Sequence, residues 1–288
     1  MAGLLSGLES LGLGNLENVG IFDKEKKEEK VREKAKVRKE PVFSETDFIY
    51  DKTFRCPACE SSFTSKIMKT GKAKLIRTDF DLRPVYEGFA AEKYDVLLCP
   101  KCGYAALGRY FPFLLPAQAK LIREKITSNI VLTKYEDPTY SFEQALERYK
   151  IALACSVVKR SKSSEKAYVC LRMAWLLRSY REYLETQDGD NEELIESLQS
   201  QEEEYEENAY RGFLDARGTE DPPIAGMDST TLDYLLAQLA FYLEDYPTCS
   251  RLVAGILNSS AGNPRLKDKI RTLKDQLSEI RNSEDKTE

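Results

Sequence analysis

The chain of 288 residues contains no histidine. This absence excludes a histidine general base, a histidine-activated nucleophile and the histidine-containing zinc motifs of deaminases and metalloproteases. The G-x-S-x-G, P-loop and G-x-G-x-x-G motifs of hydrolases, nucleotide-binding proteins and dinucleotide-binding proteins are absent too. We therefore expect a protein that is not an enzyme.

Long apolar runs and an excess of positive charge are also missing. No stretch is apolar enough to span a membrane, and the amino terminus lacks the basic and apolar regions of a signal peptide. The net charge of −5 gives no general case for nucleic-acid binding. With 42% hydrophobic and 32% charged residues, the chain has the length and composition of about two soluble domains. A cytoplasmic location is expected.

Four of the seven cysteines form two C-x-x-C pairs: Cys56 with Cys59, and Cys99 with Cys102. A two-residue spacer lets both thiolates of a pair converge on one ion from a tight turn, so the pairs predict two knuckles that share one metal. Gly103 follows the second pair and suits the left-handed backbone that such turns often need. Glu60 takes the same place after the first pair, so we expect that turn to close less favourably.

The metal is expected to be zinc in a structural role, because four thiolates complete a tetrahedron and leave no position for water. A rubredoxin-like iron site is the alternative, since tetrahedral sulfur ligation suits both metals. A redox dithiol is a third possibility. The remaining Cys155, Cys170 and Cys249 are interpreted as small buried residues, and this cysteine usage fits a reducing compartment.

Residues 43–113 are predicted to form the metal-binding module. The segment 94–98 has strand-like composition and leads into the second knuckle, and Thr70-Gly71 marks a hairpin over residues 66–77. A small antiparallel sheet that carries two knuckles is a zinc ribbon. Metal binding would supply the folding free energy of such a small module.

Basic residues are concentrated in the predicted hairpin: Lys66, Lys69, Lys72, Lys74 and Arg77. A basic zinc ribbon can contact phosphates, which makes nucleic-acid binding an alternative function. Aromatic residues for base stacking are few here, however. A charged, exposed hairpin that resists edge-to-edge aggregation is the favoured interpretation.

A row of alternating charges follows: Arg77, Asp79, Asp81 and Arg83. If the segment is extended, all four side chains point to one face. A salt-bridged strand face is the favoured interpretation, and a polar binding surface is the alternative. Two carboxylates two residues apart could also perform acid–base chemistry or hold a hard cation.

Residues 114–282 are predicted to be helical, with small and larger apolar residues recurring at a fixed spacing. The pattern occurs at Ala145, Tyr149 and Ala152, at Ala209, Phe213 and Ala216, and more weakly at Cys249, Val253 and Ile256. Each copy follows a helical stretch, over residues 117–134, 165–184 and 229–244. This is the spacing of the second helix of a tetratricopeptide unit, although generic helical hairpins remain open.

Two further features of the helical part bear on function. Trp175 is interpreted as a buried core anchor. Between residues 185 and 221 there are fourteen Asp or Glu residues, which we interpret as a solvated helix face. If this acidic run lined a concave groove, it would select basic peptides.

The two ends are predicted to be largely disordered. Residues 1–42 combine a leucine stripe among glycines with a mixed-charge linker, and residues 283–288 form a polar tail. The stripe could dock on its own helices or on a partner. The predicted fold class is thus α+β, a small β-rich zinc ribbon followed by a tetratricopeptide-like helical domain.

Together these residues resemble a bacterial family catalogued as domain of unknown function 2225. The resemblance covers residues 45–280. It depends on the two C-P-x-C pairs, the second followed by Gly103-Tyr104-Ala105, on Arg77, Asp79 and Asp81, and on Tyr86, Tyr94, Ala174-Trp175 and Tyr234-Leu235. It implies a zinc ribbon joined to tetratricopeptide-like helices, and it implies no activity.

From the sequence we therefore expect a non-catalytic adaptor or scaffold that binds a protein or peptide and holds a structural zinc ion between its four paired cysteines. A nucleic-acid-binding zinc ribbon is one alternative. A metal-dependent or redox protein is the other. The identity of the partner, the pathway and the oligomeric state stay open.

Overall fold

The computed structural model describes residues 44–133, 136–259 and 264–284. The described residues belong to one compact unit. The segment and linker predicted for residues 1–42, and residues 285–288 of the predicted tail, lie outside the described residues. Residues 283 and 284, also assigned to that tail, belong to the last helix.

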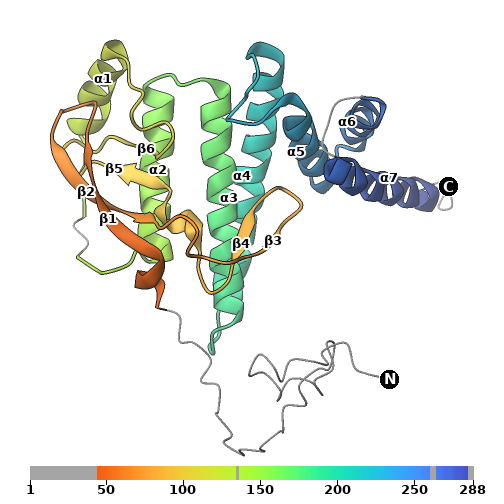
Figure 1. The fold of residues 1–288 in the computed structure, drawn as a ribbon, viewed down its shortest axis with the longest axis horizontal. Coiled ribbons are helices and arrows are strands. Elements are labelled where there is room, and N and C mark those ends of the chain that lie inside the picture. The colour runs from red at the N-terminus through yellow and green to blue at the C-terminus, as the bar shows by residue number, and fades with distance from the viewer. Residues whose placement is uncertain (1–43, 134–135, 260–263, 285–288) are drawn as a thin grey trace, which may run out of the picture. The chain divides into compact units, whose positions relative to one another are not determined.

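The first part of the described chain consists of short antiparallel hairpins (Figure 1). They pair β1 (Ile49–Arg55) with β2 (Ser62–Met68), β3 (Leu75–Thr78) with β4 (Pro84–Tyr86), and β5 (Val96–Leu98) with β6 (Ala105–Leu107). Two short 3-10 helices, η3 (Glu45–Phe48) and η4 (Ala91–Tyr94), precede β1 and β5. The hairpins form three two-stranded sheets rather than the single small sheet that the sequence suggested.

The hairpin predicted over residues 66–77 is wrong. Strand β2 pairs with β1 in the register Arg55↔Ser62, while β3 pairs with β4. The turn at Gly71, where φ is +75°, therefore connects two different sheets. The physical reason is that the first knuckle already brings β2 back against β1, where Phe54 and Phe63 lie opposite each other with ring centroids 6.0 Å apart.

The rest of the described chain is helical. The helices are α1 (Pro116–Ile122), which continues as the π-helix η5 (Arg123–Thr127), α2 (Phe142–Val158), α3 (Ser163–Glu185), α4 (Glu192–Thr219), α5 (Ser229–Tyr242), α6 (Tyr246–Asn258) and α7 (Pro264–Glu284). Side chains cap three of their starts. Ser141, Asp228 and Asp245 each accept a hydrogen bond from the main-chain N–H three residues later.

All nine of the recurring small and larger apolar residues are at most 3% exposed. Those of α2 share a core with β5 and β6, and the Tyr149 hydroxyl contacts Glu92 O of η4 and the Asp95 carboxylate. Helix α3 packs on α2 and α4, and α5 packs on α6 (Figure 1). At the α3–α4 contact the backbones approach so closely that a Cβ on Gly212 would lie 2.8 Å from the Ala167 Cβ. The small residues Gly212 and Ala167 thus allow α3 and α4 to approach closely.

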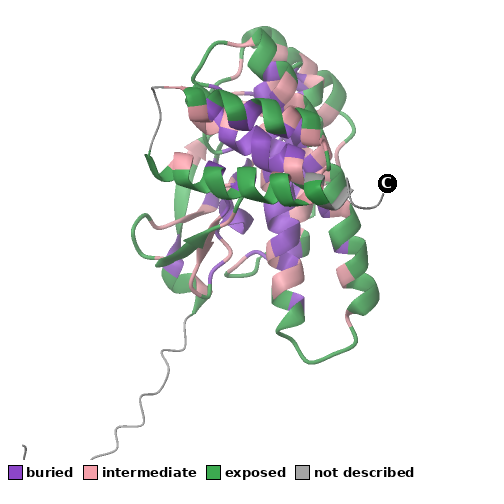
Figure 2. Ribbon diagram, turned by 90° about the vertical axis from the view of Figure 1, so that its right-hand side faces the viewer, coloured by how far each residue is buried: buried purple, intermediate pink, exposed green. Residues whose placement is uncertain are grey.

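One hydrophobic core joins the β-rich part to the helices. Buried residues of both knuckles and of β5 and β6 belong to the same cluster as those of α2 and α3. A second cluster continues from α3 through α7. Figure 2 shows buried residues concentrated along the inner helix faces, with the outer faces exposed. The boundary expected between residues 113 and 114 therefore does not separate two cores.

Candidate functional site

Both C-x-x-C pairs form the turns of β-hairpins, the first between β1 and β2 and the second between β5 and β6. The turns have the same hydrogen bonds. Cys56 N donates to Ser61 O at 2.9 Å, and Cys99 N donates to Tyr104 O at 2.9 Å. The residue after each pair has positive φ, +73° at Gly103 and +60° at Glu60. The strained position expected at Glu60 is confirmed.

The four thiols of these turns meet at one point. All four sulfur atoms lie within 4.8 Å of one another. The Cys56 and Cys102 sulfurs are 3.6 Å apart, and those of Cys59 and Cys99 are 3.7 Å apart. Zinc–sulfur bonds of about 2.3 Å in a tetrahedron place the sulfurs about 3.8 Å apart. The cluster therefore has the dimensions of a tetrahedral thiolate site for one metal ion.

The chemistry of the donors also fits a metal. The neighbouring Cys102 and Cys56 thiols lower the pKa of Cys99, which favours a thiolate in the cluster. The Ser61 hydroxyl lies 2.8 Å from the Cys59 sulfur, and a hydroxyl donor at that distance stabilises a thiolate. Cys59 is partly exposed while the other three are buried, so the cluster lies just beneath the surface.

The helix η5 contacts the main chain of both knuckles. Arg123 donates to Ala58 O at 3.0 Å in the first knuckle, and Thr127 donates to Cys102 O at 2.7 Å in the second. Cys155 of α2 receives a hydrogen bond from Ala105 N at 3.4 Å. The sequence analysis missed these supporting residues. They lie 25 to 65 residues from their partners, so no local motif marks them.

The three cysteines outside the cluster are buried, as the sequence indicated. Burial raises the pKa of Cys155 and Cys170 to about 11 and that of Cys249 to about 12. They are therefore thiols at neutral pH and unreactive.

The charged row does not form one strand face. The chain reverses at residues 79–82, with Leu82 at a φ of +72°, and Asp81 and Arg83 are almost fully buried. Arg83 Nε donates to Asp79 Oδ2 at 2.7 Å, and Arg83 also reaches Glu182 of α3 at 2.5 Å. The row is thus a set of ion pairs that ties the β3–β4 hairpin to a helix.

This network continues into α3 and α4. Trp175 Nε1 donates to Asp81 Oδ2 at 2.7 Å, and Arg178 lies 3.1 Å from the same carboxylate. Arg178 also contacts Glu202 and Glu206 of α4, each at 2.5 Å. Trp175 is therefore a buried anchor, as expected, and in addition a hydrogen-bond donor to a buried carboxylate.

The acidic run of α4 is only partly a solvated face. Glu202 and Glu206 are almost fully buried against Arg178, while Glu193, Glu196 and Glu203 are exposed. Burial raises the pKa of Glu206 to about 8, although the nearby Arg178 lowers it. The sequence analysis interpreted the whole acidic run as a solvated face, because nothing in the sequence shows that Arg178 of α3 contacts Glu202 and Glu206.

The basic residues of the predicted hairpin are distributed over two sheets and several partners. Lys66 pairs with Asp51 at 3.3 Å, Lys74 with Glu87 at 3.3 Å, and Arg77 with Asp79 at 2.9 Å. Lys69 donates to Asp47 O at 3.0 Å. Carboxylates thus pair with three of the five basic residues that had suggested phosphate binding.

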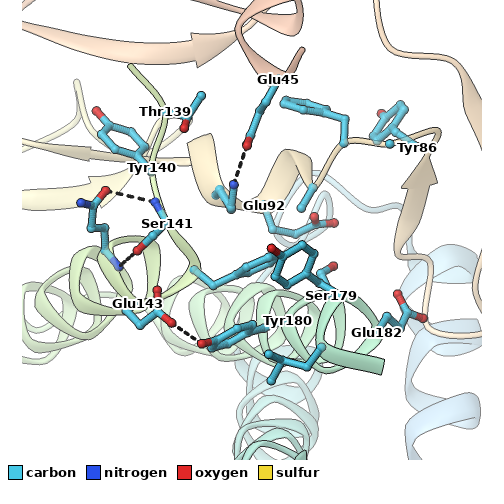
Figure 3. A pocket seen from close by; sticks show the side chains of 18 of the residues that line it. Glu45, Tyr86, Glu92, Thr139, Tyr140, Ser141, Glu143, Ser179, Tyr180 and Glu182 are labelled. Carbon is cyan, nitrogen blue, oxygen red and sulfur yellow. Dashed lines mark hydrogen bonds and ion pairs between the residues drawn. The ribbon is translucent and has the colours of Figure 1, made fainter. Parts of the chain in front are cut away.

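A cavity of about 970 Å³ lies between β4, η4, the segment before α2 and the second half of α3 (Figure 3). Its walls carry aromatic rings and carboxylates, and one carboxylate, Glu92, is only 2% exposed. Burial raises the pKa of Glu92 to about 7. The sequence analysis did not single out Glu92, because the residues around it come from four separate segments.

The comparison with family profiles gave one match, over residues 49–277, to a family described as "Uncharacterized protein conserved in bacteria (DUF2225)". The chain belongs to the DUF2225 family. Comparisons with curated proteins and with solved structures found no match. Of the helices in the described part of this DUF2225 protein, none has the length and apolar character needed to cross a membrane.

The residues that carried the resemblance to DUF2225 have structural roles here. Tyr94 donates to Glu45 at 2.8 Å and stacks on Tyr140, and Tyr86 lines the cavity. Tyr234 is 1% exposed in the second core. The residues behind the family resemblance thus belong to the four-cysteine cluster, the buried ion pairs and one wall of the cavity.

Proposed function

We propose that this protein is a non-catalytic adaptor or scaffold, with a structural zinc ion in the four-cysteine cluster and a helical surface that binds a protein or peptide. The observation that carries the proposal is the spacing of the four sulfurs, which matches a closed tetrahedron. A metal with four thiolate ligands has no position for substrate or water. Its role is then to hold the scaffold together.

Two details support zinc in a zinc ribbon. Each knuckle is the turn of its own β-hairpin, and η5 fixes both knuckles through their main-chain carbonyls. Contacts of this kind orient the ligands of a metal site. Iron fits the same four sulfurs, so elemental analysis decides between the metals.

The binding role is supported by the helices. Consecutive helices pack on one another and their small residues are buried, and we infer tetratricopeptide-like pairs from this packing. Stacked pairs of that kind present an extended surface. The exposed side of α4 is acidic. Glu193, Glu196 and Glu203 lie on one exposed face at 3.6 residues per turn, beside the buried face that carries Glu202 and Glu206. Such an acidic face would attract a basic partner.

The metal is tested by elemental analysis of protein purified without chelator. We expect one zinc per chain in the wild type, loss of zinc in Cys99→Ser, and full zinc content in the control Cys170→Ala, which alters a buried cysteine outside the cluster. Iron with a reversible redox change would instead support electron transfer. A chain without metal would contradict the structural site.

The adaptor role is tested by affinity capture with two charge-matched baits. One carries Glu193→Lys, Glu196→Lys and Glu203→Lys on α4. The other carries Asp268→Lys, Asp275→Lys and Glu279→Lys on exposed positions of α7. A partner retained by the wild type and the α7 variant, but lost with the α4 variant, supports the proposal. If the zinc-loaded wild type enriches no protein over a blank resin, the adaptor role is wrong.

A further inference from the structure

The cavity beside α3 combines aromatic rings with an excess of negative charge. Its rings are Tyr86, Phe89, Tyr140, Phe142, Tyr180 and Tyr183. Its charged residues comprise five carboxylates, from Glu45, Glu92, Asp137, Glu143 and Glu182, and two cations, from Arg83 and Lys93. Rings and carboxylates together are the chemistry that recognises an organic cation.

Most of these charges are already engaged. Lys93 pairs with Glu45 at 2.6 Å, and Arg83 pairs with Glu182 at 2.5 Å. Glu143 accepts a hydrogen bond from the Tyr180 hydroxyl. Because both cations are neutralised by carboxylates of the same walls, the cavity offers little to an anionic ligand.

Glu92 differs from the other carboxylates. Its side chain is almost fully buried, and its Oε1 has no hydrogen-bond partner among the described residues. Figure 3 shows Glu92 extending from η4 toward the side of the cavity where α3 carries Ser179 and Tyr180. A buried oxygen without a donor is costly, so a ligand that donates a hydrogen bond to it would be stabilised.

The same wall already holds one ammonium group in this way. Lys93, the neighbour of Glu92, has only 8% of its side chain exposed and pairs with Glu45. Its Nζ lies 5.0 Å from the centroid of the Phe142 ring. A carboxylate on one side and an aromatic ring on the other thus bind a buried ammonium inside the protein.

We propose that this cavity binds an alkylammonium group, with Glu92 as its carboxylate and the tyrosine and phenylalanine rings as its walls. A free amine and a lysine side chain of a peptide present the same group. The proposal therefore does not depend on the adaptor function, and a peptide ligand would connect the two.

The pH dependence of binding follows from the surroundings of Glu92. Burial raises the pKa of Glu92 to about 7. The nearby charges of Arg172 in α3 and of Arg83 act to lower this pKa, and the charge of Asp95 acts to raise it. The Tyr149 hydroxyl of α2 contacts the main-chain oxygen of Glu92. Because the ligand needs the carboxylate, its affinity is expected to fall several-fold from pH 7.5 to pH 6, where an alkylamine stays fully charged.

The test is calorimetric titration of the full chain, with zinc present, by two pairs of probes. The first pair is n-butylammonium chloride and uncharged n-butanol. The second is the peptide acetyl-Gly-Lys-Gly-amide and the same peptide with an acetylated lysine side chain. We expect the charged member of at least one pair to bind at least tenfold more tightly than its neutral counterpart. Binding of the amine alone or of the peptide alone identifies the source of the group.

Variants locate the site. Glu92→Gln keeps the shape of the side chain and should weaken binding at least tenfold, and Tyr183→Leu, at a ring that is 48% exposed, should weaken it several-fold. Glu206→Gln is the matched control, since Glu206 is also buried with an oxygen lacking a partner but lies outside the cavity. Unchanged binding in Glu92→Gln overturns the proposal. Equal binding of charged and neutral probes overturns it too, as does binding of calcium chloride with neither amine.

Discussion

Replacing Gly103 by alanine should destabilise the protein much more than replacing Gly71, although both glycines have positive φ. Gly103 has a φ of +73° and Gly71 a φ of +75°. An L-residue in this region costs about 1–2 kcal/mol, and this cost applies to both variants. The sites differ in what surrounds the new methyl group.

At Gly103 the added Cβ would lie 2.7 Å from Cγ2 and 2.9 Å from Cδ1 of Ile130, whereas at Gly71 no atom lies within 4 Å. Overpacking of this kind costs about 1–3 kcal/mol. Gly103→Ala should therefore lose about 2–5 kcal/mol of unfolding free energy, and Gly71→Ala about 1–2 kcal/mol. Because Gly103 closes the second knuckle, only the first of these variants should also release metal more easily.

The assay is urea unfolding in the presence of zinc, followed by the fluorescence of the single tryptophan. A competing chelator then measures metal retention. Equal losses of stability in the two variants would refute the argument from packing. Glu60→Gly in the first knuckle should instead raise the unfolding free energy, because glycine relieves the strain of a φ of +60°. Glu60→Gln is the control for loss of the exposed ion pair with Arg55.

Further predictions concern the buried ion pairs. Trp175→Phe removes the indole N–H that donates a hydrogen bond to Asp81, so it should cost about 1–3 kcal/mol. Because this variant has lost the fluorescent probe, its urea unfolding and that of the wild type are followed by far-ultraviolet circular dichroism, and a loss near zero would show that the bond contributes nothing. Arg178→Met leaves the buried carboxylates of Asp81 and Glu202 without their cation and should cost about 3–5 kcal/mol. Arg217→Met removes a half-exposed pair and should cost under about 1 kcal/mol, and similar losses in the two variants would contradict this ranking. Burial raises the pKa of Glu206 from 4.5 to about 8 in the folded protein, so the folded state binds this proton more tightly than the unfolded state does. The resulting stabilisation is fully present below pH 4.5 and is lost as the pH rises to about 8. Unfolding free energy measured from pH 5 to 8 should thus decline less steeply in Glu206→Gln, and parallel curves would disprove the assignment.

The four-cysteine cluster could be predicted from the sequence because its signal is local. Two residues between cysteines fix a turn, and Gly103 and Glu60 occupy equivalent left-handed positions in the two turns. The helix pairs were predicted for a similar reason. Small residues such as Ala209 and Ala216 recur at helical spacing and are fully buried where α4 meets its neighbours.

Pairings between distant segments could not be predicted. The prediction of a hairpin at Gly71 was wrong because the knuckle before β2, and not the turn after β2, determines which strand β2 pairs with. Glu202 and Glu206 were assigned to a solvated face, since only the fold places Arg178 between them and Asp81. The contacts of Arg123 and Thr127 with the knuckles, and the position of Glu92 in the cavity, likewise join segments that are far apart in the chain.

The shared core of knuckles and helices links two equilibria that would be independent in separate domains. If the sulfurs are brought together only when α2 and η5 pack on the hairpins, part of the metal's binding free energy is used to fold the helices. The apparent metal dissociation constant then reports the stability of the whole unit. A destabilising substitution in α3, far from any sulfur, would weaken metal binding by mass action alone, and metal supply in turn would set the fraction of chains whose helical surface is formed.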